Sequence, residues 1–205
     1  MRFASRFGFT IEEKTADAIR RFAYLLKEIA PERIREELKG ILLGDHAGKI
    51  LCEYDDVMGM IIPELEAARG FVQFSPDHYE DVYRHTIRVL SFTEKDITLR
   101  LAALFHDLSK PQGLTLNVDQ IALYEHHAEN SGVIARNILE SLHFEKKLAH
   151  EIGEIIALHE TSFPEQLPEM CRWLAKTGEK VLLAGIRLKE CDLLAMVSGQ
   201  GRKLE

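Results

Sequence analysis

Histidine and aspartate side chains gather in the middle of this chain. Seven of the nine histidines fall between positions 85 and 159, and several acids accompany them. His106 and Asp107 are adjacent at the end of the apolar run LAALF, so a helix would carry both side chains into its core end. A carboxylate buried there without a partner has a large desolvation cost, which a divalent cation would remove. The pair therefore indicates a metal site.

This pair cannot form a metal site alone. Adjacent helix positions point about 100° apart, so both side chains reach one ion only beyond the helix end, and other helices must add ligands. His85 and Asp192 are candidates, since each lies in an otherwise apolar helical segment. The alternative is a hydrogen-bonded polar pair without an ion. Six ligand-type side chains on five predicted helices favour the metal: His85, His106, Asp107, His127, His159 and Asp192.

The segments that must position these residues are all predicted to be helical. Apolar residues recur at helical spacing, and no segment shows the alternation and hairpin turns of a β-sheet. We therefore predict an all-α fold. The predicted helices cover residues 11–29, 31–43, 45–58, 79–92, 95–108, 120–142, 145–160, 166–177 and 179–197, with a short helical segment before Gly70.

Local signals set the expected ends of these helices. Thr10 and Glu13 form a capping-box pattern, which predicts the start of the first helix. Gly59 is expected to break the third helix, and Pro111 to end the helix that carries His106. The turn-rich residues 111–119 predict a loop.

Length and composition describe one compact chain or two small helical units. The 205 residues are 46% apolar and 29% charged, and a chain of this size buries roughly 70% of its unfolded surface without needing a disulfide. Cys52, Cys171 and Cys191 are odd in number and far apart, so we expect free thiols in a reducing compartment. No apolar run approaches the roughly 18 residues of a membrane span, and no signal peptide is evident. We expect a cytoplasmic protein without a membrane partner.

The net charge of −7 argues against a chain that binds nucleic acid through a basic field over its whole surface. A local basic strip stays open. Trp173 and the phenylalanines are expected to belong to a core, because a nucleic-acid stacking platform would need aromatic residues interleaved with lysine or arginine.

The residue pattern resembles a known family. His85, the pair in AALFHDLSKP, His127, His159 and Asp192 together resemble the HD superfamily of metal-dependent phosphohydrolases. RFASRFGFTIEEKTADAI, PERIREELKGIL, IIPELEAARGFVQ and DVYRHT are similar to the region that follows the catalytic head in bacterial tRNA nucleotidyltransferases, the CCA-adding enzymes that carry an HD domain. The resemblance covers nearly all of residues 1–197. It implies a helical neck or body of RNA-binding type over residues 1–70, an HD-domain-like helical bundle over residues 71–198 and a flexible tail over residues 199–205.

The resemblance also implies roles for the candidate residues. His85, His106, Asp107 and Asp192 match the ligands of a first ion, and His127 and His159 match those of a second ion that Asp107 bridges. The ions would activate a water for attack on phosphorus. Asp107 and Lys110 are the catalytic candidates, with Lys110 supplying positive charge to the phosphate or the leaving oxygen. The alternative for Lys110 is a solvated side chain that complements a helix end.

The expected cofactor is one or two divalent metal ions. Mixed imidazole and carboxylate ligands leave the element open among manganese, iron, cobalt, nickel, zinc and magnesium. The expected substrate is a nucleotide or RNA phosphoester, such as a 2′,3′-cyclic phosphate or a phosphomonoester, and tRNA is a further candidate partner.

The chain also departs from the resembling enzymes. Their amino-terminal head carries a glycine-serine loop, a pair of metal-binding aspartates on a β-sheet and an EDxxR-type element, and none of these is present here. We therefore expect no nucleotidyl transfer from this chain, which would be a fragment or a headless protein. Two hypotheses stay open: a metal-dependent phosphohydrolase, or a tRNA-binding body fragment with no activity of its own. A purely structural helical protein would leave the buried histidines and aspartates unexplained.

Overall fold

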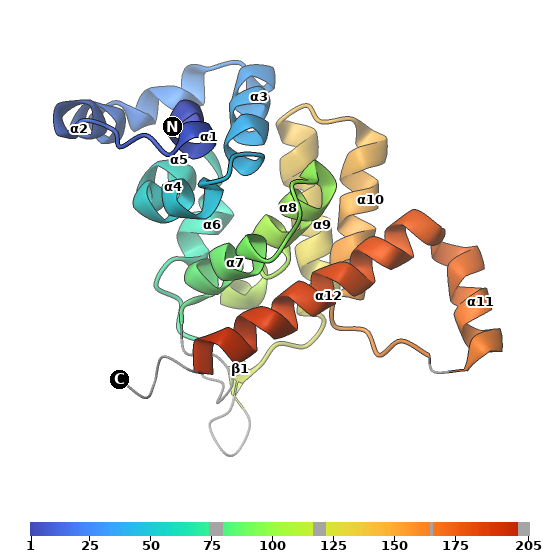
Figure 1. Ribbon diagram of the computed structural model, residues 1–205. Helices are drawn as coiled ribbons and strands as arrows, with labels where there is room; N and C mark the ends of the chain where they lie inside the picture. Colours follow the sequence, from blue (N-terminus) through green and yellow to red (C-terminus); the bar gives the residue numbers. More distant parts are fainter. Residues whose placement is uncertain (74–79, 117–121, 165, 201–205) are drawn as a thin grey trace.

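The computed structural model describes residues 1–73, 80–116, 122–164 and 166–200, and these residues form an all-α fold, as predicted (Figure 1). A first layer of short helices occupies the amino-terminal third of the chain. It consists of α1 (Arg2–Phe7), α2 (Glu13–Arg21), the 3-10 helix η1 (Ala23–Glu28), α3 (Pro31–Leu42), α4 (Ala47–Glu53), α5 (Asp55–Ile61) and α6 (Pro63–Ala68).

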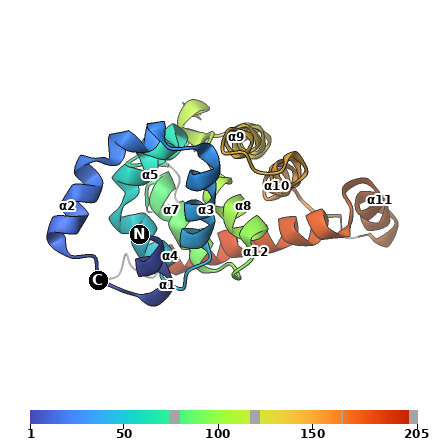
Figure 2. The same cartoon turned by 90° about the horizontal axis from the view of Figure 1, so that it is seen from above.

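The remaining elements build a larger helical bundle. In Figure 1, α8 lies at its centre, α12 crosses it, and α11 projects away from the body. Figure 2 shows α9 and α10 end-on and side by side. The elements are α7 (Val82–Ser91), α8 (Ile97–Phe105), the 3-10 helix η2 (Lys110–Gln112), the antiparallel strand pair β1 (Thr115–Leu116) and β2 (Ala122–Leu123), α9 (His127–Ser141), α10 (Lys146–Leu158), α11 (Leu167–Thr177) and α12 (Glu179–Gln200).

Helix α8 is the most deeply buried element. Its residues from Thr98 to Phe105 are all buried, in keeping with its nearly unbroken apolar sequence. The helix begins at Asp96, whose Oδ1 accepts a hydrogen bond from the backbone N–H of Leu99 at 2.9 Å. Helix α8 ends at Phe105, before the predicted end at residue 108, and Pro111 lies in η2 and does not end it. His106 and Asp107 therefore emerge beyond the helix end, in the interior of the bundle.

Two predicted helices are divided in the structure. Residues 11–29 form α2 and η1, and the amino-terminal cap of α2 is Glu12, whose carboxylate accepts from the backbone of Thr15 at 2.9 Å, so the predicted capping box at Thr10 is wrong. Residues 45–58 form α4 and α5, which separate at Tyr54. Gly59 lies inside α5 and does not break it. A side chain at this position would collide with Glu66 of the adjoining α6, so close packing accounts for the glycine.

Other differences lie at element ends. Helix α1 was not predicted; it is short and ends at Gly8 in the left-handed conformation (φ 72°). Helix α9 begins at His127 and not at residue 120, because Ala122 and Leu123 pair with β1 inside the stretch predicted as a loop. Helix α12 continues to Gln200, into the predicted tail, and residues 201–205 lie outside the described residues.

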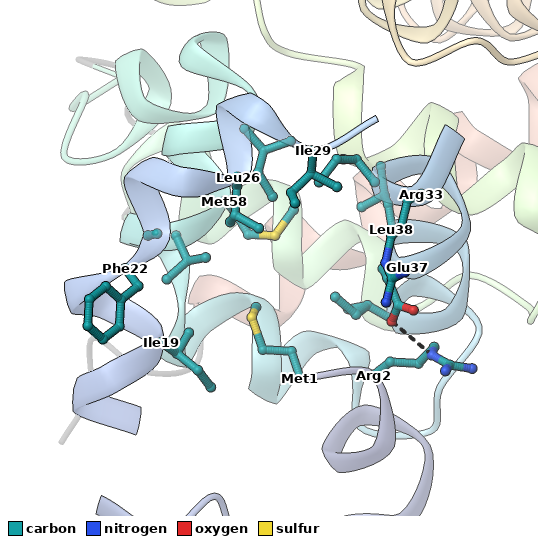
Figure 3. Close-up of a pocket in the computed structure, with 15 residues that line it drawn as sticks. Met1, Arg2, Ile19, Phe22, Leu26, Ile29, Arg33, Glu37, Leu38 and Met58 are labelled. Carbon is teal, nitrogen blue, oxygen red and sulfur yellow. Dashed lines mark hydrogen bonds and ion pairs between the residues drawn. The ribbon is translucent and has the colours of Figure 1, made fainter. Parts of the chain in front are cut away.

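The first layer forms an apolar pocket of about 410 Å³ that is partly open to solvent, drawn in Figure 3. Aliphatic side chains such as Ile19, Leu26 and Met58 line it, and Arg2 and Glu37 form an ion pair of 2.9 Å at its edge. None of its lining residues is a histidine or an aspartate, so this pocket has no part in the predicted metal chemistry. In the part of the chain that the structure describes, every helix is too short or too polar to cross a membrane.

Candidate metal centre

The six predicted ligand residues meet at one place in the bundle, and all six side chains are buried. Helix α7 supplies His85, and α12 supplies Asp192. The turn that follows α8 supplies His106 and Asp107, and the turn that follows α10 supplies His159. His127 is the first residue of α9. Five helices separated in sequence therefore place His85, His106, Asp107, His127, His159 and Asp192 around a common centre.

One group of ligand atoms surrounds Asp192. Its Oδ1 lies 2.8 Å from His85 Nε2 and 3.9 Å from His106 Nε2. On the opposite side, Asp107 Oδ2 lies 3.3 Å from His106 Nε2 and 3.8 Å from His85 Nε2. The ligand atoms of His85, His106 and Asp192 all lie within 4.8 Å of one another, which is close enough for one ion to contact them.

The second carboxylate oxygen of Asp107 faces a different pair of histidines. Asp107 Oδ1 lies 3.4 Å from His127 Nε2 and 3.8 Å from His159 Nε2. The carboxylate of Asp107 thus stands between the two groups, with one oxygen directed to each. This is the arrangement that a bridging ligand requires.

Backbone carbonyls fix the orientation of three of the rings. His106 Nδ1 lies 2.8 Å from Ala103 O, His127 Nδ1 lies 2.9 Å from Tyr124 O, and His159 Nδ1 lies 2.7 Å from Ile156 O. Because a carbonyl only accepts, Nδ1 carries the proton in each ring, and Nε2 of the neutral ring offers its lone pair to the centre. Histidines that bind a metal through Nε2 show the same hydrogen-bond pattern at Nδ1.

Three buried polar atoms at the centre have no hydrogen-bond partner among the described residues: His106 Nε2, His127 Nε2 and Asp107 Oδ1. Buried polar atoms in folded proteins are almost always paired, so such a concentration needs an explanation. Imidazole nitrogen and carboxylate oxygen are both donors that divalent transition ions accept. The residues present therefore fit a divalent metal ion.

Electrostatics keep the carboxylates ionised. Burial alone would raise the pKa of Asp107, but the charges of His106 and Lys110 outweigh it and hold the pKa well below its usual range. Burial also opposes ionisation of Asp192, yet the hydrogen bond from His85 helps to lower its pKa to about 2. Both side chains are therefore anionic near neutral pH, the form that binds metal.

The two central histidines respond differently. Burial, together with the charge of His106, lowers the pKa of His159 to about 4, so this ring is neutral at pH 7. Burial also tends to lower the pKa of His106, but the neighbouring Asp107 charge more than compensates, and the pKa is raised. A cation that displaces the proton from His106 would relieve the same negative charge.

Lys110 is not a solvated lysine, so that alternative is wrong. Its side chain is buried, and Nζ donates to Asp107 Oδ2 at 2.7 Å and to Gln73 Oε1 at 2.9 Å. The ammonium also lies 5.6 Å from the ring centroid of Tyr124. Gln73 and Tyr124 were not predicted, because neither carries a sequence signal that distinguishes it from a loop or core residue.

Glu160 is a further residue that the sequence analysis missed. Its Oε1 lies 3.4 Å from His127 Nε2, although more than half of its side chain is exposed. A signal was present in the sequence, because Glu160 follows His159 directly, as Asp107 follows His106.

A cluster of exposed aromatic side chains lies on the amino-terminal layer. The expectation that the phenylalanines belong to the core is wrong for these residues. Phe3, Phe7 and Phe9 are 59%, 52% and 62% exposed. Their rings adjoin one another, with centroids 6.3 Å apart for Phe3 and Phe7 and 5.5 Å apart for Phe7 and Phe9. Arg2 and Arg6 lie over Phe3 and Phe7. We call these five residues the Arg-Phe strip, which the repeated Arg-Phe pairs of RFASRF could have indicated.

The three cysteines are free thiols, as predicted. Burial raises the pKa of Cys191 to about 11, so this thiol stays protonated at neutral pH. Cys171 is exposed, and Cys52 is partly buried.

Two family descriptions match the chain. The family described as "HD domain" matches residues 82–197, and the family described as "Probable RNA and SrmB- binding site of polymerase A" matches residues 8–69. Together they cover both the first layer and the bundle.

Several curated proteins are similar to this chain. The CC-adding tRNA nucleotidyltransferase of Thermus thermophilus is 31% identical over 191 residues, which are 86% of this chain and 43% of that protein. The A-adding tRNA nucleotidyltransferase of Deinococcus radiodurans is 32% identical over 130 residues, or 58% of this chain and 30% of that protein. The CCA-adding enzyme of Bacillus cytotoxicus is 47% identical over 93 residues, or 45% and 23%. The chain thus spans less than half the length of each of these relatives.

Proposed function

Because this chain belongs to the HD-domain family, we propose that its bundle is a divalent-metal-dependent phosphohydrolase that acts on a nucleotide or RNA phosphoester. One observation carries the proposal: six buried ligand-type side chains meet at one centre, where three of their polar atoms have no hydrogen-bond partner among the described residues. A core without an ion would have no use for so many unpaired polar atoms.

In this proposal the six ligand residues form two metal positions. His85, His106, Asp107 and Asp192 would hold one ion, and His127, His159 and Asp107 would hold another. When bound, such ions supply Lewis-acid charge to phosphoryl oxygens and activate a water molecule at neutral pH. The carbonyl-bound Nδ1 atoms keep the rings fixed.

Lys110 adds positive charge at the same centre. Hydrogen bonds to Asp107 and Gln73 hold its ammonium in place. The side chain therefore loses no further conformational freedom when a substrate binds. A phosphate group bound at the centre would lie near this ammonium. The ammonium would stabilise the negative charge that develops during phosphoester cleavage.

We further propose that residues 1–70 hold RNA, and that the RNA is tRNA. Residues 8–69 match an RNA-binding family description, and the similar curated proteins are named as tRNA nucleotidyltransferases. The Arg-Phe strip offers aromatic faces and cations together, which is how proteins bind single-stranded nucleic acid without sequence preference.

The names of the similar proteins also favour a second candidate function. The chain would then be a tRNA-binding body with no activity of its own, and the buried centre would serve the stability of the bundle. Hydrolysis of a phosphoester separates the two candidates.

The test combines metal content with activity. Untagged wild type, Asp107→Ala and Asp107→Asn would be analysed by metal mass spectrometry. They would then be assayed with manganese, nickel or cobalt on 2′,3′-cyclic AMP and p-nitrophenyl phosphate. We expect one or two ions per wild-type chain and metal-dependent hydrolysis, with both lost in the variants. Asp17→Ala, which changes an exposed aspartate of α2, is the control and should match wild type. Wild type without metal or hydrolysis would exclude the hydrolase and leave the tRNA-binding body.

A further inference from the structure

Resting on the proposed function, we propose that Glu160 is a ligand of the second divalent cation. It would act with His127, His159 and Oδ1 of Asp107, and it would make this position open to solvent. The metal ligands implied by the sequence resemblance do not include this residue.

The donor atoms of these residues are already assembled. Those of His127, His159 and Glu160 lie within 4.8 Å of one another. His127 Nε2 is 3.4 Å from Glu160 Oε1 on one side and 3.4 Å from Asp107 Oδ1 on the other. His127 Nε2 and Asp107 Oδ1 are two of the atoms without a hydrogen-bond partner in the described chain. Two nitrogen and two oxygen donors thus face a shared space.

The fold explains why Glu160 reaches this space. Helix α10 ends at Leu158, and a turn follows in which the N–H of Thr161 bonds to the carbonyl of Leu158 at 3.0 Å. This turn directs His159 inward and leaves Glu160 at the surface, beside the first residue of α9. The close packing of α9 against α10 brings that first residue, His127, to the same end of the pair.

Exposure distinguishes this position from the other one. The side chains of Asp107, His127 and His159 are at most 5% exposed, whereas that of Glu160 is 58% exposed. Three ligands therefore form a buried wall, and the fourth closes the open side. An ion held partly by an exposed carboxylate is expected to bind more weakly and to exchange faster than one held by buried ligands alone.

A simple ion pair between Glu160 and a charged His127 is the competing explanation. Such a pair contributes little to stability, because the glutamate is mostly exposed. The two explanations predict different metal stoichiometries, because only a ligand role makes ion binding depend on Glu160.

The experiment is a titration with Mn²⁺, an ion that accepts both imidazole and carboxylate ligands. Chelator-treated wild type, Glu160→Gln and Glu160→Ala would be titrated by calorimetry, and bound manganese would be counted by mass spectrometry after gel filtration. Glu154→Gln is a matched control, since Glu154 on α10 is also an exposed glutamate beside a histidine, 3.6 Å from His150. Thermal unfolding would verify that each variant is folded.

We expect two binding events in wild type and in Glu154→Gln. In both Glu160 variants the weaker event should lose at least tenfold in affinity, while the tighter event stays unchanged. A single event in wild type, or two unchanged events in Glu160→Gln, would overturn the ligand role and leave the proposed hydrolase intact. Wild type that binds no manganese would overturn the metal-dependent function as well.

Discussion

The Lys110 ammonium lies in the protein interior, where its charge is balanced by Asp107 alone among the acids within ion-pair distance in the described residues. Breaking a buried pair by removing one partner typically costs about 3–5 kcal/mol, because the other charge is left uncompensated. We expect Lys110→Met to lower the free energy of unfolding of the metal-free protein by about 3 kcal/mol. With Mn²⁺ present the loss should be much smaller, since the cation supplies the missing charge.

Urea unfolding with chelator and with Mn²⁺ would measure both values. Lys14→Met, which alters an exposed lysine of α2, should leave stability unchanged in either condition. An equal loss for Lys110→Met in both conditions would show that the ammonium does not act through the charge of Asp107.

His159 makes the metal-free protein sensitive to acid. Its pKa is lowered to about 4 by burial, whereas an unfolded histidine has a pKa near 6.5. Between these two pKa values the unfolded state binds a proton at this histidine and the folded state does not. The free energy of unfolding therefore falls as the pH drops from about 6.5 to about 4. This group should contribute a loss of about 3 kcal/mol over that range.

Unfolding by urea in chelator, repeated at intervals between pH 7 and pH 4, would test this expectation. His159→Gln should flatten the dependence, and His150→Gln, at an exposed position, should not. The interpretation would be wrong if both variants followed the wild-type curve.

Helices α9 and α10 are positioned by two glycines that face each other. A Cβ atom on Gly132 would lie 2.5 Å from the carbonyl oxygen of Gly153, so Gly132→Ala must push the helices apart. We expect a loss of about 1–3 kcal/mol in stability. Metal affinity should also fall, because these helices carry His127 and position His159. Calorimetry with Mn²⁺ and thermal unfolding would measure the two effects.

Gly48 in α4 provides the control for the glycine substitution. A Cβ atom there would meet only Ile87 at 3.5 Å, an ordinary contact. Gly48→Ala should therefore be neutral or stabilising by up to about 1 kcal/mol, since alanine favours a helix. Equal behaviour of the two variants would refute the packing argument.

The Arg-Phe strip should bind single-stranded RNA. Each base stacked on an aromatic ring contributes about 1–3 kcal/mol, so removing the rings of Phe3 and Phe7 together should weaken binding of a short oligoribonucleotide at least tenfold. Fluorescence anisotropy at low salt would measure the affinity. Tyr24→Ala removes an exposed ring outside the strip and should have little effect. Unchanged affinity in the double variant would assign these phenylalanines to contacts other than RNA.

At the level of elements, the sequence predicted helices that follow from apolar periodicity. It did not predict helix ends that depend on contacts with neighbouring elements. The apolar run of α8 has a strong local signal, and His106 and Asp107 follow it in the structure as predicted. The division at Tyr54 and the start of α9 at His127 depend on packing and on pairing with β1, which leave no local pattern. Glu160 was missed although it follows His159 directly, because its role in the proposed site depends on contact with a different helix.

At the scale of the whole molecule, the proposed ligands join helices that are distant in sequence. An ion bound only by the folded state stabilises it by about 4 kcal/mol at a thousandfold excess over Kd. For a chain of this size that corresponds to roughly 10 °C in Tm. Scanning calorimetry should therefore show a higher Tm with Mn²⁺ than with chelator in wild type, and no difference in Asp107→Asn.

Hydrogen exchange would show where that stabilisation acts. The added protection should concentrate in α7, α8 and α12, which carry or adjoin His85, His106 and Asp192. Helices α2 and η1 pack on α5 and carry no proposed ligand, so their exchange should change little. Protection that rose equally in both layers would contradict this expectation, because it would mean that the two layers open as one cooperative unit.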